Sequence, residues 1–365
     1  MTPPVPLTGG CAHPPAAVFD VALLDLDGVV YVGPDAVPGV PAALARVAAA
    51  GMRLGFVTNN ASRTPEEVAA HLRELGVAAS AGDVITSSQA AATVVADRLG
   101  RGARVLAVGG PGVAAALTAA GLTVVGDAGD RPEAVVQGYG RDVGWAELAE
   151  AVVAVRNGAE HVATNADATI PSPRGPLPGN GALVDVVSAV TGRAPLVTGK
   201  PDPAMHAECV RRTGARLPLV VGDRLDTDVE GARRAGAASL LVLSGVTDAR
   251  RLLAAPPHQR PDLLAGDAAG LLAAHPAVVT AEGGAHRCGR WTARAAGGAV
   301  ELVAGEGDPA AAPREAPDDG LDGLRALCVA HWFAVDRAPG DPAPHPRAAG
   351  PAAAAALARW GLEGR

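Results

Sequence analysis

Short apolar runs alternate with longer helical patterns along most of this chain, and few folds accommodate that alternation. Helical segments such as PAALARVAAAG and PEEVAAHLRELG separate the runs. The runs occupy residues 21–27, 53–60, 83–88, 103–110, 134–138, 160–165, 195–200, 217–223 and 238–245. Runs without polar alternation are typical of strands buried on both faces of a parallel sheet, with helices as crossovers. The sequence therefore predicts an α/β fold with a doubly wound, Rossmann-like parallel sheet.

The chain is too long for one ordinary core, because its 365 residues exceed the roughly 100–200 residues of a typical domain. The pattern changes at residue 256. HPAVV, GRWTARA and GAVELVAGEG indicate a short antiparallel meander, and an Asp- and Pro-rich segment at 306–323 leads into the helical pattern LDGLRALCVAHWF. We therefore expect a separate small α+β domain over residues 256–365.

Composition narrows the classes of function. The formal net charge is −7, and an acidic chain does not attract phosphate backbones or anionic lipids, so neither nucleic acid nor a membrane is an expected partner.

The N-terminal MTPPVPLTGGCAHPP lacks the features of a signal peptide, and no run approaches the roughly 20 apolar residues that span a bilayer. The four cysteines form no CxxC pair, which favours reduced thiols. We expect a cytoplasmic protein.

Polar residues end several of the apolar runs. They are Asp25, Asp27 and Gly28 after the first run, Thr58, Asn59 and Asn60 after the second, Lys200 after the seventh, and Asp223, Asp226 and Asp228 after the eighth. Ligands of parallel sheets bind beyond the carboxyl ends of the strands. Several carboxylates, a hydroxyl, amides and one ammonium suit a phosphate bound together with a hard cation such as Mg²⁺.

The first of these groups has a spacing with a physical reason. Asp25 and Asp27 stand two positions apart, so on a strand both leave the same face. Two carboxylates held close together repel, and a cation or a shared proton relieves the repulsion. Gly28 then permits a tight turn that aims backbone N–H groups at an anion. We therefore expect Mg²⁺ at this strand end.

Lys200 is the only lysine of the chain, and every other basic residue is an arginine. A coding bias that replaces lysine by arginine should spare a site where a compact ammonium must fit beside carboxylates. The position of Lys200 after the strand pattern PLVTG therefore supports a role in the same site.

Four strings of the sequence resemble, in order and spacing, the motifs of the haloacid dehalogenase superfamily of aspartate-nucleophile phosphatases. They are DLDGVVY, TNN, the lysine in VTGKP, and GDRLDTD. Over residues 18–250 the chain is similar to the subclass with a large α/β (C2-type) cap, which includes 4-nitrophenylphosphatases and pyridoxal, phosphoglycolate and glycerol-3-phosphate phosphatases. The resemblance implies a discontinuous core at 16–86 and 196–255, with a cap at 87–195.

The resemblance also implies the roles of individual residues in an Mg²⁺-dependent reaction. Asp25 would be the nucleophile, Asp27 the general acid and base, and Thr58, Asn59 and Lys200 would complete the catalytic set. Leu26, Gly28 and Asn60 would bind phosphate, and Asn165 and Asp167 of the cap would contact the substrate. Asp25, the main chain of Asp27, Asp223 and Asp228 would hold the metal. Asp226 is better explained as a charge at a helix N-terminus.

The substrate is expected to be a small phosphorylated metabolite. The chain has few aromatic residues to stack on a ring, which favours an aliphatic phosphoester. Glycerol 3-phosphate is therefore the first choice, and phosphoglycolate and pyridoxal phosphate are alternatives. The resemblance leaves open a homodimer formed through the cap.

Several single motifs also allow other interpretations, which have less support than the phosphatase interpretation. Residues 110–115 imitate a dinucleotide fingerprint, and GRAPLVTGKP imitates a P-loop with the wrong spacing. A phosphoacceptor signalling domain uses a similar residue set but is much shorter. The loop 347–352 resembles the pyrophosphate loop of acetyltransferases, although Pro351 removes a backbone donor. We expect an actinobacterial-type, acetyltransferase-like C-terminal domain that is not catalytic, with acetyl-CoA binding as the alternative.

Overall fold

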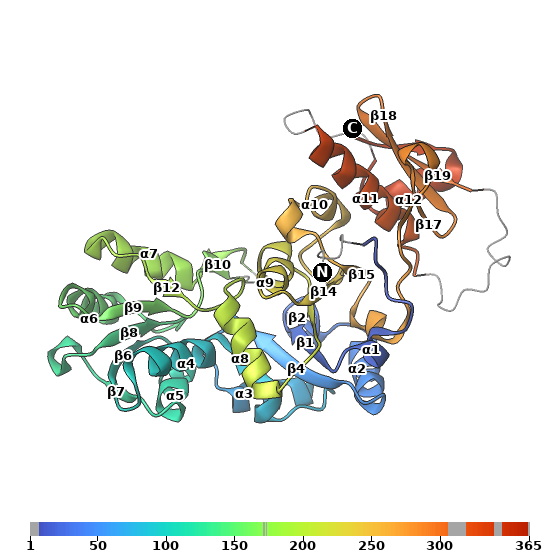
Figure 1. Cartoon of the computed structure of the whole chain (residues 1–365). Helices are drawn as coiled ribbons and strands as arrows, with labels where there is room; N and C mark the ends of the chain where they lie inside the picture. Colours follow the sequence, from blue (N-terminus) through green and yellow to red (C-terminus); the bar gives the residue numbers. More distant parts are fainter. Residues whose placement is uncertain (1–6, 171, 173, 306–318, 339–344, 364–365) are drawn as a thin grey trace. The chain divides into compact units, whose positions relative to one another are not determined.

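The computed structural model describes residues 7–170, 172, 174–305, 319–338 and 345–363 (Figure 1). The predicted segment at 306–323 therefore lies largely outside the described residues, as do the first six residues of the chain. The chain divides into two compact units, which are described in turn. The first joins Met1–Leu54 to Leu217–Arg365, and the second is Gly55–Arg216.

A parallel sheet organises the first unit. Its strands lie in the order β15-β14-β13-β1. They are β1 (Val21–Asp25), β13 (Pro218–Gly222), β14 (Ala238–Val242) and β15 (Leu263–Ala265). The predicted parallel strands are therefore present, and their apolar side chains are buried because helices and loops cover both faces.

Short elements surround this sheet. The helices are α1 (Pro15–Val18), α2 (Val40–Ala49), α9 (Glu230–Arg234) and α10 (Ala249–Leu253). A small antiparallel pair, β2 (Tyr31–Val32) and β3 (Asp35–Ala36), follows β1. The chain turns into that pair at Gly28, whose φ of 81° lies in the left-handed region that favours glycine.

The C-terminal part of the first unit forms a second sheet, ordered β16-β17-β18-β19-β20. Its strands are β16 (Val279–Thr280), β17 (His286–Cys288), β18 (Trp291–Ala296), β19 (Ala299–Ala304) and β20 (His345–Ala349). The first four are antiparallel, as the meander predicted, whereas β20 pairs parallel to β19. Two helices pack on this sheet, α11 (Asp322–Arg337) and α12 (Pro351–Arg359).

The two sheets of the first unit share one hydrophobic core. Leu241 and Leu264 of the parallel sheet belong to the same buried cluster as Leu302 of β19 and Leu327 of α11. Arg325 of α11 is 1% exposed, and its guanidinium donates to the carbonyl of Leu264 at 2.5 Å. The C-terminal sheet is therefore an integral part of this unit.

The second unit contains a parallel strand pair and a parallel sheet. The pair is β4 (Arg53–Thr58) and β5 (Val84–Thr86), with helices α3 (Pro65–Glu74), α4 (Ser87–Leu99) and α8 (Pro203–Thr213). The sheet has the order β12-β9-β8-β6-β7. Its strands are β6 (Arg104–Val108), β7 (Thr123–Val125), β8 (Ala134–Gln137), β9 (Glu160–Ala163) and β12 (Leu196–Val197).

Successive residues of these strands enter two different hydrophobic clusters. Val105 and Val136 pack with α4 and with α5 (Pro111–Ala119). Leu106 and Val135 pack with α6 (Trp145–Arg156) and α7 (Asn180–Thr191). Because neighbouring residues of a strand point to opposite faces, one helix pair covers each face, and Figure 1 shows this layering. A hairpin of β10 (Thr169–Ile170) and β11 (Leu177–Pro178) precedes α7.

The glycines of residues 110–115 allow this segment to pack closely against the backbone of residues 61–63. A side chain at Gly112 would overlap the backbone carbonyls of Ala61 and Arg63, and the Gly112 N–H already donates to the carbonyl of Ser62 at 3.1 Å. The protein's own loop therefore occupies the place that a dinucleotide phosphate would need.

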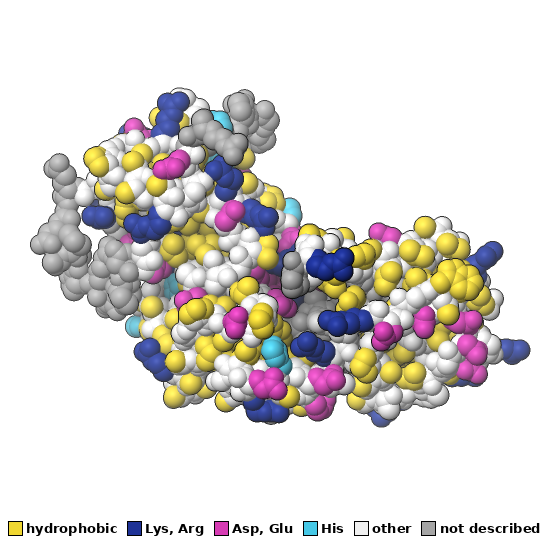
Figure 2. Space-filling view, turned by 180° about the vertical axis from the view of Figure 1, so that it is seen from behind, with side chains coloured by type: hydrophobic (Ala, Val, Ile, Leu, Met, Phe, Trp, Pro, Cys, Tyr) yellow, Lys and Arg dark blue, Asp and Glu magenta, His cyan; other side chains and the backbone are white. Residues whose placement is uncertain are grey.

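The molecular surface mixes charge types. Acidic and basic side chains are interspersed on the face shown in Figure 2. Within the described residues, no helix combines the length and the apolar character needed to cross a membrane.

Candidate active site

Three carboxylates of the first unit converge. Asp25 ends β1, Asp223 follows β13, and Asp228 lies in a π-helical turn, Leu225–Val229. One oxygen of each lies within 4.8 Å of the others. β1 and β13 are paired in parallel, so their carboxyl ends meet at one edge of the sheet. Asp223 and Asp228 are buried at 1% and 2% exposure, and Asp25 is half-buried.

Backbone N–H groups orient these carboxylates. Asp25 Oδ1 accepts from the Leu26 N–H at 2.8 Å, and Asp228 Oδ2 accepts from the Arg224 N–H at 3.1 Å. Asp223 Oδ2 accepts from the Val246 N–H at 2.6 Å. A Cβ at Gly28 would lie 2.7 Å from Asp223 Cγ, so only glycine lets the chain pass this close to the carboxylate.

The donor set fits a hard divalent cation. Three buried or half-buried carboxylates held this close are unfavourable unless positive charge compensates them, and carboxylate oxygens are the ligands that Mg²⁺ and Ca²⁺ take. Among the described residues the cluster comprises these three groups, and the exposed carboxylate of Asp27 stands outside it.

Asp226 also stands outside the carboxylate cluster. Its exposed side chain pairs with Arg224, with 2.9 Å between Arg224 Nη2 and Asp226 Oδ2. Burial alone would raise the pKa of Asp226, but the bonds from Arg224 outweigh it, so that the pKa lies below its usual range. Asp226 therefore forms a surface ion pair.

The second unit holds the predicted residues at the end of β4 and just after it. Thr58 is buried, and its Oγ1 accepts from the Asn60 N–H at 3.0 Å. The Asn60 carboxamide oxygen accepts from the N–H of Ser62 at 2.9 Å and from its hydroxyl at 2.8 Å. The loop after β4 is therefore a tight turn held by its own side chains.

Asn59 connects three segments of this unit. Its Oδ1 accepts from the Lys200 N–H at 2.9 Å, and its Nδ2 donates to the Lys200 carbonyl and to Asp167 Oδ2, each at 3.2 Å. Asn165 Nδ2 donates to the Asn59 carbonyl at 2.7 Å. A Cβ at Gly199 would lie 2.8 Å from Asn59 Oδ1, which explains the glycine before the lysine. The structure thus brings Asn59, Lys200, Asn165 and Asp167 together.

Several supporting residues were not predicted. The Ser87 hydroxyl donates to the Asn59 carbonyl at 2.7 Å, and Asn180 Nδ2 donates to the Asn165 carbonyl at 2.8 Å. In the first unit, the Ser244 hydroxyl donates to the Gly28 carbonyl at 2.7 Å. Ser87 and Ser244 both lie at the ends of apolar runs, so the rule that identified the other residues would have found them.

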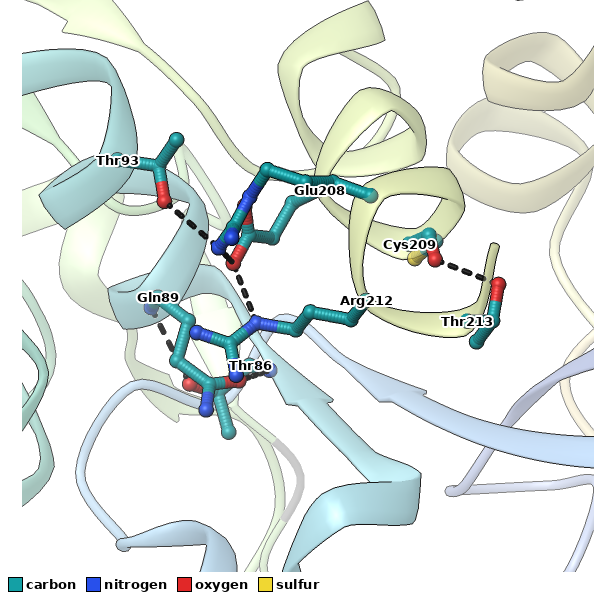
Figure 3. Close-up of polar contacts among 8 residues, drawn as sticks. Thr86, Gln89, Thr93, Glu208, Cys209, Arg212 and Thr213 are labelled. Carbon is teal, nitrogen blue, oxygen red and sulfur yellow. Dashed lines mark hydrogen bonds and ion pairs between the residues drawn. The ribbon is translucent and has the colours of Figure 1, made fainter. Parts of the chain in front are cut away.

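A buried ion-pair network joins α8, which begins just after Lys200, to α4. Glu208 is 2% exposed and accepts from Arg211 Nε at 2.8 Å and from Arg212. Figure 3 shows Glu208 turned toward Arg212, and Arg211 Nη2, which also binds Glu208, donates to Thr93 Oγ1 of α4 at 3.2 Å. Burial raises the pKa of Glu208, but the two guanidiniums outweigh it and hold the pKa below its usual range. The carboxylate is therefore ionised and orients Arg211, whose hydrogen bond to Thr93 links α8 to α4.

Comparisons with known proteins identify the family. Residues 22–123 match the model described as haloacid dehalogenase-like hydrolase, residues 197–271 match a second model of hydrolases of that type, and residues 288–362 match a GCN5-related N-acetyltransferase like domain. A D-glycerol 3-phosphate phosphatase of Mycobacterium tuberculosis is 45% identical over 320 residues, which are 87% of each chain. The fold is that of a hydrolase of this type, and this chain belongs to the haloacid dehalogenase-like hydrolases.

Solved structures place the chain more narrowly. Crystal structures of a glycerol phosphate phosphatase from Mycobacterium tuberculosis match with TM-scores of 0.86 in complex with calcium and 0.83 in complex with magnesium. The sequence identities are 42% and 43%, and each match covers 96% of this chain and 99% of the other. An acid sugar phosphatase of Staphylococcus aureus is 38% identical over 231 residues, which are 63% of this chain and 88% of that protein. Within the family, the chain therefore lies among phosphatases, and the predicted acetyltransferase-like C-terminal fold is confirmed.

Proposed function

We propose that this protein is an Mg²⁺-dependent phosphomonoester hydrolase whose substrate is glycerol 3-phosphate. The cluster of Asp25, Asp223 and Asp228 is the observation that carries the proposal, because it offers the oxygen ligands of a hard cation beside a strand-end nucleophile. The 45% identity to a D-glycerol 3-phosphate phosphatase supports the choice of substrate.

In the proposed reaction Asp25 attacks phosphorus and the bond to the leaving oxygen breaks, which gives an aspartyl phosphate. Asp27 donates a proton to the departing alkoxide. It then accepts a proton from the water that hydrolyses the aspartyl phosphate. The exposure of Asp27, two residues after the half-buried Asp25, supports different roles for the two carboxyl groups.

The other core residues would bind and neutralise the transferring phosphoryl group. Thr58, the N–H of Asn59 and the ammonium of Lys200 are proposed to act on its oxygens and on Asp25, and Leu26, Gly28 and Asn60 to line the phosphate site. The bonds that hold Lys200 to Asn59 support this grouping. Because the ammonium is a compact point charge, a Lys200→Arg variant is expected to lose most of the activity.

Asp25, Asp223, Asp228 and the main-chain carbonyl of Asp27 would hold the Mg²⁺. The bound cation would supply positive charge that stabilises phosphoryl oxygens in an in-line transfer. The backbone donors to Asp223 and Asp228 keep those carboxylates oriented for this purpose.

Residues 87–195 are proposed to act as the cap that selects the substrate, between the two core segments 16–86 and 196–255. Asn165 and Asp167 would contact the leaving group, and their bonds to Asn59 place them beside a proposed phosphate-binding residue. Phosphoglycolate and pyridoxal phosphate are the alternative substrates. A homodimer through this cap is part of the proposal, and so is a location in the cytoplasm.

Residues 256–365 are proposed to be noncatalytic. Gly350, with a φ of 98°, and Pro351, the first residue of α12, lie at the loop that resembles a pyrophosphate-binding loop. Pro351 has no N–H to offer to a phosphate there. This favours a structural role over acetyl-CoA binding.

The test is phosphate release from purified protein, with glycerol 3-phosphate, phosphoglycolate and pyridoxal phosphate compared by kcat/KM. Asp25→Asn should abolish both turnover and the aspartyl phosphate, whereas the exposed Asp35→Asn should keep full activity. Undiminished phosphate release by Asp25→Asn would overturn the mechanism. A higher kcat/KM for phosphoglycolate or pyridoxal phosphate would overturn the assignment of glycerol 3-phosphate as the substrate.

A further inference from the structure

The loop that holds the carboxylate of Asp223 connects β14 to α10. Within this loop, residues 243–248, the Val246 N–H donates to Asp223 Oδ2 at 2.6 Å and the Thr247 N–H donates to the Asp223 carbonyl at 3.2 Å. The Ser244 hydroxyl binds the Gly28 carbonyl at 2.7 Å. A displacement of the loop would therefore disturb one carboxylate of the cluster directly.

The loop is in turn anchored to α10. Asp248 caps this helix, since its Oδ1 accepts from the Arg251 N–H at 2.8 Å. Arg251 Nη1 reaches back to the Val246 carbonyl at 2.9 Å. The helix has only 5 residues, and so short a helix is not stable by itself in water. Its position depends on the surfaces against which it packs.

One of those surfaces belongs to the acetyltransferase-like domain. Leu252 and Leu253 of α10 are buried in the same cluster as residues of α11. The indole N–H of Trp332, a buried residue of α11, donates to the Leu253 carbonyl at 3.0 Å. This bond satisfies a carbonyl at the end of α10 that has no partner within a helix. Arg250 Nη2 donates to the Gly361 carbonyl, just after α12, at 2.6 Å.

Trp332 is itself held firmly. The guanidinium carbon of Arg260 lies 5.1 Å from the centre of the indole ring, and Arg260 Nη2 donates to Asp336 Oδ1 at 2.8 Å. Arg260 Nε donates to the Ala255 carbonyl at 3.1 Å, shortly after α10. Arg260 therefore links Trp332 and Asp336 of α11 to the segment that follows α10.

We propose that the acetyltransferase-like domain serves as a brace for the metal site. Trp332 fixes α10, α10 fixes the 243–248 loop, and the loop orients Asp223 toward Asp25 and Asp228. Trp332 is a positioning residue for a reaction that takes place elsewhere in the unit. This inference rests on the proposed function, because it assumes that the three carboxylates hold Mg²⁺.

The test is Mg²⁺ binding to the full-length chain, measured by titration calorimetry with magnesium chloride alone. Trp332→Phe removes the N–H donor and keeps an aromatic ring. It should raise the Kd for Mg²⁺ about three- to tenfold, as expected from the loss of one buried hydrogen bond that helps to orient a ligand. Trp291→Phe is the matched control, because Trp291 of β18 is also buried in this domain but makes no hydrogen bond to α10 within the described residues. It should leave the Kd within about twofold.

Thermal unfolding and steady-state kinetics distinguish positioning from a loss of folding. Both tryptophan variants should lose stability, but only Trp332→Phe should require more Mg²⁺ for half-maximal activity while keeping kcat at saturating Mg²⁺. The proposal would be overturned if Trp332→Phe bound Mg²⁺ as tightly as the unmodified protein. It would also be overturned if Mg²⁺ binding were weakened equally in both tryptophan variants.

A second variant covers the case in which Trp332→Phe does not fold. Arg250→Ala removes an exposed side chain and its bond to Gly361, and should weaken Mg²⁺ binding in the same direction by a smaller factor. An unchanged Kd in Arg250→Ala would then count against the proposal. If the unmodified protein binds no Mg²⁺, the proposed function fails; if it binds Mg²⁺ and the variants do not differ, only the brace fails.

Discussion

The carboxamide of Asn59 binds both backbone polar groups of Lys200. The N–H of Lys200 donates to Asn59 Oδ1 at 2.9 Å, and Asn59 Nδ2 donates to the Lys200 carbonyl at 3.2 Å, between residues 141 positions apart. The same Nδ2 reaches Asp167. A single side chain thus fixes the backbone of the only lysine and connects it to a proposed substrate-contacting residue.

Asn59→Ala should therefore lower kcat for phosphate release by about 10- to 100-fold, because the backbone of Lys200 loses two bonds and a misplaced catalytic group is costly. Steady-state phosphate release measures this effect. Asn157→Ala, at the exposed end of α6, is the control and should retain the activity of the unmodified protein. Full activity in Asn59→Ala would show that Lys200 is positioned by other contacts.

Asp223→Asn should raise the Mg²⁺ concentration for half-maximal activity by at least about tenfold, because a proposed ligand loses its charge. Asp226→Asn is the matched control three residues on, since its carboxylate pairs with Arg224 at the surface. Removing metal with a chelator should abolish the activity of the unmodified protein, and added Mg²⁺ should restore it. Equal Mg²⁺ requirements in the two variants would contradict the assignment of Asp223.

A comparison of Gly28→Ala with Gly33→Ala should distinguish the effect of backbone strain from the effect of a side chain placed against the Asp223 carboxylate. Both glycines have left-handed φ values, 81° and 60°, so each alanine should cost about 1–2 kcal/mol of folding stability. A Cβ at Gly28 would overlap Asp223, whereas among the described residues, apart from the two chain neighbours, no atom lies within 4 Å of a Cβ at Gly33. Gly28→Ala should therefore lose activity and should lose more melting temperature than Gly33→Ala, which bears only the backbone strain and should keep its activity. The prediction fails if Gly33→Ala loses as much activity.

His161 should make the protein less stable in mild acid. It lies in β9 at 6% exposure, and burial lowers its pKa from 6.5 to about 4. The unfolded chain then binds the proton more readily, so this residue costs no stability above pH 6.5 and about 3 kcal/mol once the pH has fallen below 4. Urea unfolding at pH 7 and pH 5 should show a smaller loss for His161→Gln than for the exposed-site control His13→Gln. If both variants lost the same stability between pH 7 and pH 5, titratable groups other than His161 would be responsible for the acid sensitivity.

Much of the fold could be predicted because its signals are local. The nine apolar runs correspond to β1, β4, β5, β6, β8, β9, β12, β13 and β14, since strands buried on both faces are apolar along most of their length. The same logic placed Asp25 and Asp223 at strand ends, and the structure shows that these two strands are neighbours. The supporting bonds from Val246 and Lys200 could not be predicted in this way, because backbone N–H donors are present at every residue but proline and leave no trace in the residue type.

The sequence by itself determined the strand ends, the three carboxylates and the single lysine, because residue type and period-two alternation act over a few positions. The resemblance already favoured Asp228 over Asp226 as a metal ligand, and the tertiary structure decided how two carboxylates of one loop come to have different surroundings. The π-helical turn buries Asp228 among the carboxylates and leaves Asp226 beside Arg224 at the surface. Tertiary packing likewise decided that α10 shares a core with the acetyltransferase-like domain, since burial depends on which apolar surfaces meet across distant parts of the chain.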